Sequence, residues 1–254
     1  MRGNWLSSEP LIIVNADDFG LRSAATDAIV ECYDARGISS TTAMVWMKDS
    51  RRAAALAGAS GIPLGLHLNL TDPFTDPVTP PLVRDRQARL ISFFRRPTRW
   101  LFNPLLHRAI ESAIQDQLDA FRLIYSVEPS HLDGHHHVQF TPNVLLSRTL
   151  PASMKLRRTY TFDRGEKIFA KRAFRALMHA SLVRRYRTPD YFFDLRHLHP
   201  DLGGSGVESK LDLARSASVE VMCHPEIADE RRVLLSGVWV DGLHALRVGS
   251  FLTL

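Results

Sequence analysis

Short apolar runs alternate with longer segments in which apolar residues recur at helical spacing. Residues 11–20, LIIVNADDFG, are apolar at first, become polar and stop at Gly20, a pattern typical of a buried parallel strand that opens into a loop. A helix is predicted from Ser23, a suitable N-cap, to Gly37, because apolar residues fall on one face between them. Strands at 41–46 and 62–70, with a helix at 49–60 between them, continue the alternation. Such alternation predicts a parallel sheet.

The alternation resumes after a proline-rich loop at residues 71–82 and a basic stretch. A long helix is predicted with Asn103 as its cap and Pro104 at its first position, and its core-facing stripe consists of Leu106, Ile110, Ala113, Leu118, Phe121 and Tyr125. Later strands are expected at 130–138, 153–160, 191–195 and 218–224, and helices at 141–150 and 166–187. The sequence therefore predicts an α/β fold, a deformed (β/α) TIM-like barrel of about seven parallel strands.

Length and composition fit one domain spanning residues 1–254. The chain is 45% hydrophobic, enough for one sizeable core. Its two cysteines, Cys32 and Cys223, are too few for a disulfide framework. The N-terminal segment has an apolar run of only four residues, too short for a signal peptide or a membrane span. We therefore expect a cytoplasmic protein.

Positive charge is concentrated in two arginine-rich stretches, residues 84–108 and 155–187, within a chain of formal net charge +5. A solvated surface is the simplest interpretation. No recognisable nucleic-acid motif accompanies the arginines, so we expect no nucleic-acid partner. The stretch 84–108 also contains aromatic and aliphatic residues, which leaves open a peripheral contact with a membrane surface.

Chemically useful side chains fall where predicted strands end. Asp17 and Asp18 end the first strand, His67 lies in the third, His135 follows Gly134, and His224 ends the last. In parallel α/β folds the βα loops emerge at the carboxyl ends of the strands, and reactive residues gather there. We expect these side chains to form one site.

The segment HLDGHHHVQF, residues 131–140, places four histidines in seven positions. On a regular strand His131, Asp133, His135 and His137 would share one face, with His136 on the other. One aspartate and two histidines from three strand ends fit a divalent metal ion with open coordination positions. Two imidazoles favour Zn²⁺ or a similar ion, although Mg²⁺ is possible. A pH switch could use the same histidines.

Four motifs resemble those of the YdjC-like carbohydrate deacetylases, in the same order: IVNADDFG (13–20), GLHLNL (65–70), HLDGHHHV (131–138) and VEVMCHPE (219–226). The resemblance implies a deformed barrel and a metal-dependent hydrolase. It implies that Asp18, His67 and His135 bind the metal, and it leaves Asp17 as the base. Glu226 stands where the family usually has glycine.

The expected reaction removes acetyl groups from N-acetylated sugars, such as an N-acetylglucosamine oligosaccharide or glycoconjugate, and releases acetate and a free amino sugar. His224 is expected to protonate the departing amine. Two alternatives remain. One is a metal-dependent hydrolase of another amide or of a phosphoester, with arginines holding the phosphate. The other is a catalytically inactive sugar-binding protein.

Overall fold

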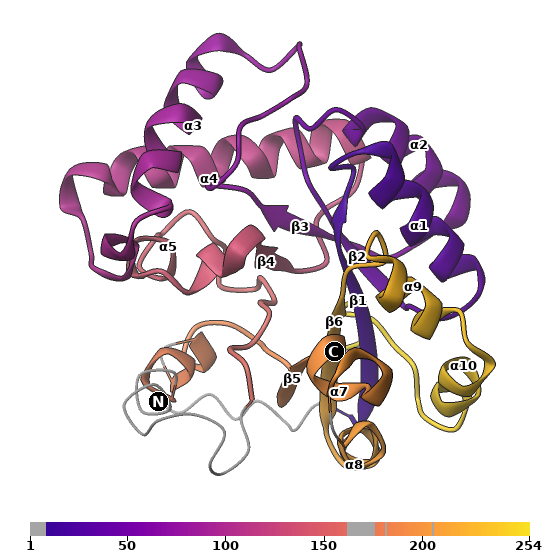
Figure 1. Ribbon diagram of the computed structural model, residues 1–254. Helices are drawn as coiled ribbons and strands as arrows, with labels where there is room; N and C mark the ends of the chain where they lie inside the picture. The colour runs from indigo at the N-terminus through magenta and orange to yellow at the C-terminus, as the bar shows by residue number, and fades with distance from the viewer. Residues whose placement is uncertain (1–8, 162–175, 181, 205) are drawn as a thin grey trace.

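Six parallel strands form one curled sheet in the computed structural model, which describes residues 9–161, 176–180, 182–204 and 206–254 (Figure 1). The strands are β1 (Leu11–Phe19), β2 (Ser40–Ala43), β3 (Leu64–Leu68), β4 (Leu132–Gly134), β5 (Tyr191–Asp194) and β6 (Ser218–Cys223). Their order in the sheet is β4-β3-β2-β1-β6-β5. The predicted parallel sheet is confirmed, and the sheet curls as a half-barrel consistent with a TIM-like fold. The predicted number of about seven strands is wrong, since the described residues form six.

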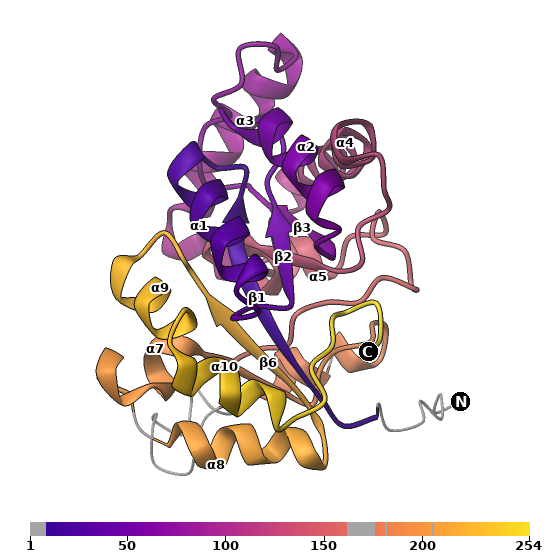
Figure 2. The same cartoon turned by 90° about the vertical axis from the view of Figure 1, so that its right-hand side faces the viewer.

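Helices cover the outside of this sheet (Figures 1 and 2). Five helices form a row in which each contacts the next. In spatial order they are α4 (Pro104–Tyr125), α2 (Ser50–Ser60), α1 (Ser23–Asp34), α9 (Ala228–Leu234) and α10 (Gly237–His244). Helix α4 begins as predicted, because the Asn103 side chain accepts a hydrogen bond from the Leu105 N–H at 3.1 Å. Its predicted stripe faces the core, with Ile110 and Phe121 fully buried. The helices therefore leave the carboxyl ends of the strands to the loops.

The predicted seventh strand, residues 153–160, is an extended segment that crosses between the two edges of the sheet. On one side Arg157 N–H donates to Leu132 O in β4 at 3.1 Å. On the other, Thr161 N–H donates to Phe192 O in β5 at 3.0 Å. A segment that changes partner so quickly forms only isolated bridges, as at Leu156 with Leu132. The sequence located the segment correctly but not its irregular pairing.

The histidine-rich strand predicted at 130–138 is much shorter in the structure. Strand β4 ends at Gly134, and residues His135–Phe140 form a 3₁₀ turn, η2. His136 and His137 adopt left-handed backbone conformations, with φ of 53° and 58°. A Cβ on Gly134 would lie 2.8 Å from the Val138 side chain, so glycine allows this turn to fold back. The expected alternation of the histidines therefore fails after Asp133.

The remaining elements form the loops around the sheet. Helix α3 (Pro81–Phe94) and the 3₁₀ turn η1 (Pro97–Trp100) occupy the basic stretch, for which the sequence indicated no helix. Shorter elements are α5 (Pro142–Leu145), α7 (Leu195–Leu198), η3 (Pro200–Leu202), α8 (Val207–Asp212) and η4 (Leu213–Arg215). The helix predicted at 166–187 lies partly outside the described residues, and residues 176–180 of it are helical. Among the described residues, no helix is long and apolar enough to cross a membrane.

Candidate metal centre

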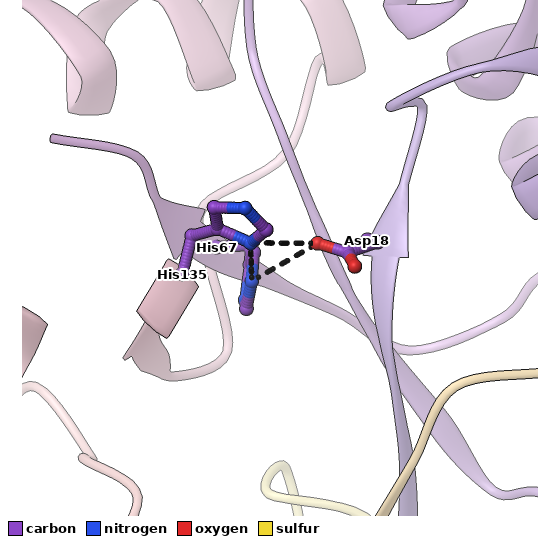
Figure 3. A group of neighbouring side chains, drawn as sticks. All are labelled: Asp18, His67 and His135. Carbon is purple, nitrogen blue, oxygen red and sulfur yellow. Dashed lines mark hydrogen bonds and ion pairs between the residues drawn. The ribbon is translucent and has the colours of Figure 1, made fainter. Parts of the chain in front are cut away.

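Three side chains from separate strand ends converge on one point (Figure 3). Asp18 Oδ1 lies 3.2 Å from His67 Nε2 and 3.0 Å from His135 Nδ1. The two imidazole nitrogens are 3.3 Å apart. The structure thus brings together the three residues that the motif resemblance implies as metal ligands.

An irregularity in β1 explains how Asp17 and Asp18 both face inward. The pairing of β1 with β2 shifts register between Ala16 and Phe19. Asp18 has φ of 73°, in the left-handed region, which aspartate tolerates better than most residues. The strand bulges here, so two consecutive side chains that would otherwise point to opposite faces serve the same site.

His67, in β3, is fixed by a carboxylate behind it. Its Nδ1 lies 2.7 Å from Asp133 Oδ1, and the Thr42 hydroxyl donates to Asp133 Oδ2 at 3.0 Å. Burial opposes a charge on this imidazole, but Asp133 and Asp18 raise the pKa of His67 well above its ordinary value. With Nδ1–H donated to Asp133, Nε2 is the nitrogen directed at the point of convergence, and a metal ion bound there would take the place of its proton.

His135 has a similar partner. Its Nε2 lies 3.3 Å from Asp72 Oδ2, while its Nδ1 faces Asp18. Asp72 is itself held by Arg95, whose Nη2 donates to Oδ1 at 2.9 Å. Each candidate imidazole ligand therefore has a carboxylate on the nitrogen away from the site, an arrangement that orients metal-binding histidines.

The geometry and chemistry of the three atoms fit a divalent transition metal ion. Asp18 Oδ1 is buried and accepts no hydrogen bond from any residue that the structure describes. Ligand atoms about 2.0–2.1 Å from a tetrahedral ion lie roughly 3.3 Å apart, close to the distances between these three atoms. One carboxylate oxygen and two imidazole nitrogens suit Zn²⁺ or a similar ion. His135 and Asp18 are 12% and 15% exposed, so the site can be reached from solvent.

Two other residue groups with metal-ligating atoms share members with this centre. Asp72, His135 and His136 form one, on the more exposed side. Asp17, His67 and Asp133 form the other, which is fully buried. The carboxylates of the buried group already face a cation, Arg157.

Arg157 is the central residue of a buried charged network behind the candidate metal centre, and it is 0% exposed. Its two terminal nitrogens bind the two oxygens of Asp17, each at 2.6 Å. The same guanidinium lies 2.8 Å from Asp133 and donates from Nε to Glu220 at 2.7 Å. One arginine thus contacts carboxyl groups from β1, β4 and β6.

The sequence analysis gave Arg157 no functional role and placed it only in a basic stretch and in the predicted strand 153–160. Its position in a strand of a parallel sheet could have indicated that it is buried, and a buried arginine needs acidic partners. Asp133 was placed on one strand face with His131, His135 and His137 but given no role, and Asp72 was missed because its loop offers no periodic pattern.

Burial and Arg157 act in opposite directions on the carboxyl groups of this network. Burial opposes ionisation of Asp17, but the charge and hydrogen bonds of Arg157 outweigh it and hold the pKa of Asp17 well below its ordinary value. Glu220 responds differently: burial raises its pKa to about 8 despite the contact with Arg157. Asp17 is therefore ionised at neutral pH, and Glu220 largely keeps its proton.

His224 follows β6 and lies near the network rather than among the metal-ligating atoms. It is partly buried, its backbone N–H donates to Glu230 Oε2 at 2.6 Å, and its charge lowers the pKa of Asp17. At the rim, Glu226 forms an ion pair with Arg22. The residue that departs from the family pattern thus links the loops after β1 and β6.

The other histidines of the 131–137 segment do not join the three ligand atoms. His131 is buried and stacks on Phe251 with ring centroids 3.6 Å apart, and burial lowers its pKa well below the ordinary value. His136 bonds through Nδ1 to the Thr71 hydroxyl at 2.9 Å, and His137 Nε2 to the Tyr160 hydroxyl at 2.9 Å. Only one of the four histidines faces the centre.

The curled half-barrel of parallel strands places the chain among α/β proteins and is consistent with a TIM-like fold. A crystal structure from Enterococcus faecalis V583, of a protein with a proposed role in cellobiose-phosphate cleavage, matches with a TM-score of 0.66 over 96% of this chain and 98% of that one. At 20% sequence identity, this similarity concerns the fold alone.

Sequence comparison narrows the class to one family: the YdjC-like protein family matches residues 11–246, and the chain belongs to it. A carbohydrate deacetylase from Vibrio parahaemolyticus is 30% identical over 229 residues, covering 89% of this chain and 82% of that protein. A chitooligosaccharide deacetylase from Serratia marcescens is 36% identical over 137 residues, 54% of this chain and only 53% of the relative. The resemblance found in the four motifs is confirmed.

Proposed function

We propose that this protein is a metal-dependent hydrolase that removes acetyl groups from N-acetylated sugars. The observation that carries the proposal is the convergence of Asp18, His67 and His135 at 3.0–3.3 Å. Support for the substrate class comes from the names of its relatives, carbohydrate and chitooligosaccharide deacetylases. N-acetylated sugar oligomers are thus the first substrates to test.

Asp18, His67 and His135 would hold the cation, with Zn²⁺ the expected ion and Mg²⁺ the alternative. A divalent cation held there would polarise the acetyl carbonyl and make water acidic enough to attack it at neutral pH. Asp133 and Asp72 fix the two imidazoles so that the ligand nitrogens stay aimed inward.

Asp17 would accept the proton of the attacking water. Arg157 keeps it ionised and holds both oxygens in place, so the carboxylate is ready without any conformational change. The same contacts reduce its basicity, and proton transfer therefore requires water of increased acidity. Its position beside the metal-binding aspartate follows from the bulge in β1.

His224 would deliver a proton to the departing nitrogen. The bond between the acetyl carbon and the sugar nitrogen breaks, a bond between that carbon and the water oxygen forms, and the nitrogen leaves as an amine. Glu230, which holds the backbone of His224, fixes the loop that carries the imidazole. The products are acetate and a free amino sugar.

Acetate release from N-acetylglucosamine oligomers, measured together with elemental analysis, tests the proposal. Chelation should abolish turnover, and Zn²⁺ or Mg²⁺ should restore it. Asp17→Asn should keep its metal and lose about 10²–10⁴-fold in rate, whereas His67→Ala and His135→Ala should also lose metal. His244→Ala, an exposed histidine on α10, is the control and should behave as wild type.

Three outcomes would contradict the proposal. Wild-type turnover by Asp17→Asn would remove Asp17 as the base. Phosphate release from phosphoesters without acetate release would favour the other hydrolase. Bound sugar and bound metal without release of either product would indicate a binding protein.

A further inference from the structure

Apolar side chains are exposed where η1 leads into α4. Leu101, Phe102 and Leu105 are 67%, 45% and 91% exposed. Leu105 lies in the first turn of α4, whose core-facing stripe begins with the partly buried Leu106. The three residues lie within five consecutive positions, and Leu101 and Phe102 line the same groove, so this segment concentrates exposed apolar surface in a patch. We call residues 84–108, which include this patch, the α3–α4 edge.

The α3–α4 edge is strongly basic. It contains seven arginines and one acidic residue, Asp85. Arg86 pairs with Asp116 and Arg95 with Asp72. Among the residues that the structure describes, no carboxylate lies within ion-pair distance of the other five, Arg84, Arg89, Arg96, Arg99 and Arg108. The edge therefore carries uncompensated positive charge beside the exposed apolar patch.

A groove of about 510 Å³ joins the two features. Arg89 and Arg96 line it together with Phe93, Leu101 and Phe102. On α4, Arg108 is exposed one turn beyond Leu105, so charge and apolar surface also adjoin on the helix. Figure 1 shows α3 and the start of α4 at one side of the molecule, away from α9 and α10.

We propose that the α3–α4 edge is a docking surface for anionic lipid bilayers. Leu101, Phe102 and Leu105 enter the interface between headgroups and acyl chains, while Arg89, Arg96 and Arg108 pair with lipid phosphates. Three apolar side chains or a few arginines alone bind a bilayer weakly, but the two together supply the two signals that stable peripheral binding needs.

The combination of arginines and apolar side chains on the α3–α4 edge favours a lipid bilayer over other binding partners. A nucleic acid would use the arginines but would leave Leu101 and Leu105 in water. A second copy of this chain would bring the same arginines against each other, and like charges would oppose that contact. An anionic bilayer offers phosphates and an apolar layer side by side, which matches the composition of the edge.

Docking at this edge would hold the candidate metal centre near the membrane. Arg95, within the edge, donates to Asp72 at 2.9 Å, and Asp72 contacts His135. The inference does not depend on the proposed deacetylase chemistry, because the surface can bind lipid whether or not the centre is active.

Co-sedimentation of the full chain with vesicles tests the docking surface. Vesicles of phosphatidylglycerol and phosphatidylcholine should sediment the protein at low salt, and vesicles of phosphatidylcholine alone should not. Binding should weaken as salt is raised, since the arginines contribute through screened charges. Absence of binding at low salt, or equal binding to both vesicle types, would overturn the proposal.

Charge-removing variants test the arginines. Arg89→Gln, Arg96→Gln and Arg108→Gln together should weaken binding roughly 100-fold, because each arginine near an anionic surface contributes about fivefold. The control combines Arg184→Gln, Arg215→Gln and Arg232→Gln, which remove equal charge from exposed positions elsewhere. The control should bind as wild type, and equal losses in both triples would mean that net charge alone attracts the protein.

Apolar variants test insertion. Leu101→Ser with Leu105→Ser should weaken binding at least about tenfold, whereas Leu123→Ser with Leu252→Ser, also exposed leucines, should not. Unchanged melting temperatures will show that the variants remain folded. An unaffected Leu101/Leu105 variant would exclude insertion. Tighter binding to a DNA oligonucleotide than to vesicles, or a dimer that dissociates on Leu105→Ser, would replace the bilayer by another occupant.

Discussion

The candidate metal centre and the charged network behind it present opposite electrostatic situations. At the centre, a carboxylate oxygen and two imidazole nitrogens lie within 3.3 Å of one another, and no described arginine or lysine forms an ion pair with the carboxylate. In the network, the guanidinium of Arg157 already lies between Asp17, Asp133 and Glu220. The first arrangement can hold a metal ion, whereas the carboxyl groups of the second are already paired with the guanidinium of Arg157.

The contrast between the two regions shows that neighbouring acidic residues can have different partners. Asp17 and Asp18 are adjacent in sequence, yet Asp17 faces Arg157 and Asp18 faces the two histidines. Asp133 connects the two regions, because it contacts both Arg157 and His67. Disturbing either region should therefore have distinguishable effects on stability and on metal binding.

Removing the cation of the network should have the largest effect on folding. Arg157→Met leaves three buried carboxyl groups without their shared partner, and we expect the free energy of unfolding to fall by about 3–5 kcal/mol. Urea denaturation measures the loss. Arg158→Met, at the next position, removes a cation that contacts the Tyr191 ring and should lose no more than about 1 kcal/mol. Similar losses in the two variants would contradict the central role of Arg157.

Weakening the support of one imidazole should have an intermediate effect, on metal binding rather than folding. Asp72→Asn removes the carboxylate that faces His135 Nε2, and we expect metal affinity to fall about 10–100-fold. Titration against a competing chelator at fixed pH measures it. Arg95→Gln removes the other partner of Asp72 and serves as the control, with affinity expected to stay within a few fold. Wild-type affinity in Asp72→Asn would show that His135 needs no orienting partner.

The smallest effect should be that of Glu220 at acidic pH, and it should depend on pH. Because burial raises the pKa of Glu220 to about 8 from 4.5, the folded protein holds a proton that the unfolded chain releases. The contribution of Glu220 to the free energy of unfolding is therefore fully present below pH 4.5, and it is lost as the pH rises toward about 8. Glu220→Gln should therefore flatten the decline measured in chelator between pH 5 and pH 8, and change stability near pH 4.5 by less than about 1 kcal/mol. If wild type and Glu220→Gln had identical profiles of stability against pH, Glu220 would be ionised in the folded protein over this whole pH range.

Prediction from sequence succeeded where local pattern is sufficient. The Asn103 cap, the α4 stripe and the alternation of strands and helices depend on residues near one another in the chain, and all are present. Prediction failed at His136 and His137, where periodicity suggested a strand and the structure has two left-handed residues. It also missed α3, because this helix has many arginines and only a few buried residues, among them Leu90 and Phe94, to mark its core-facing side.

Patterns and motifs at strand ends were enough to predict the parallel α/β architecture, the family and the three residues that meet at the candidate metal centre. Which charged groups neutralise one another became visible only in the folded protein. Arg157 reaches Asp17 across 140 positions of the chain, and Asp72 reaches His135 from a loop without regular structure. Such pairings depend on how the sheet curls and brings distant segments together, and no local pattern in the sequence encodes that distance.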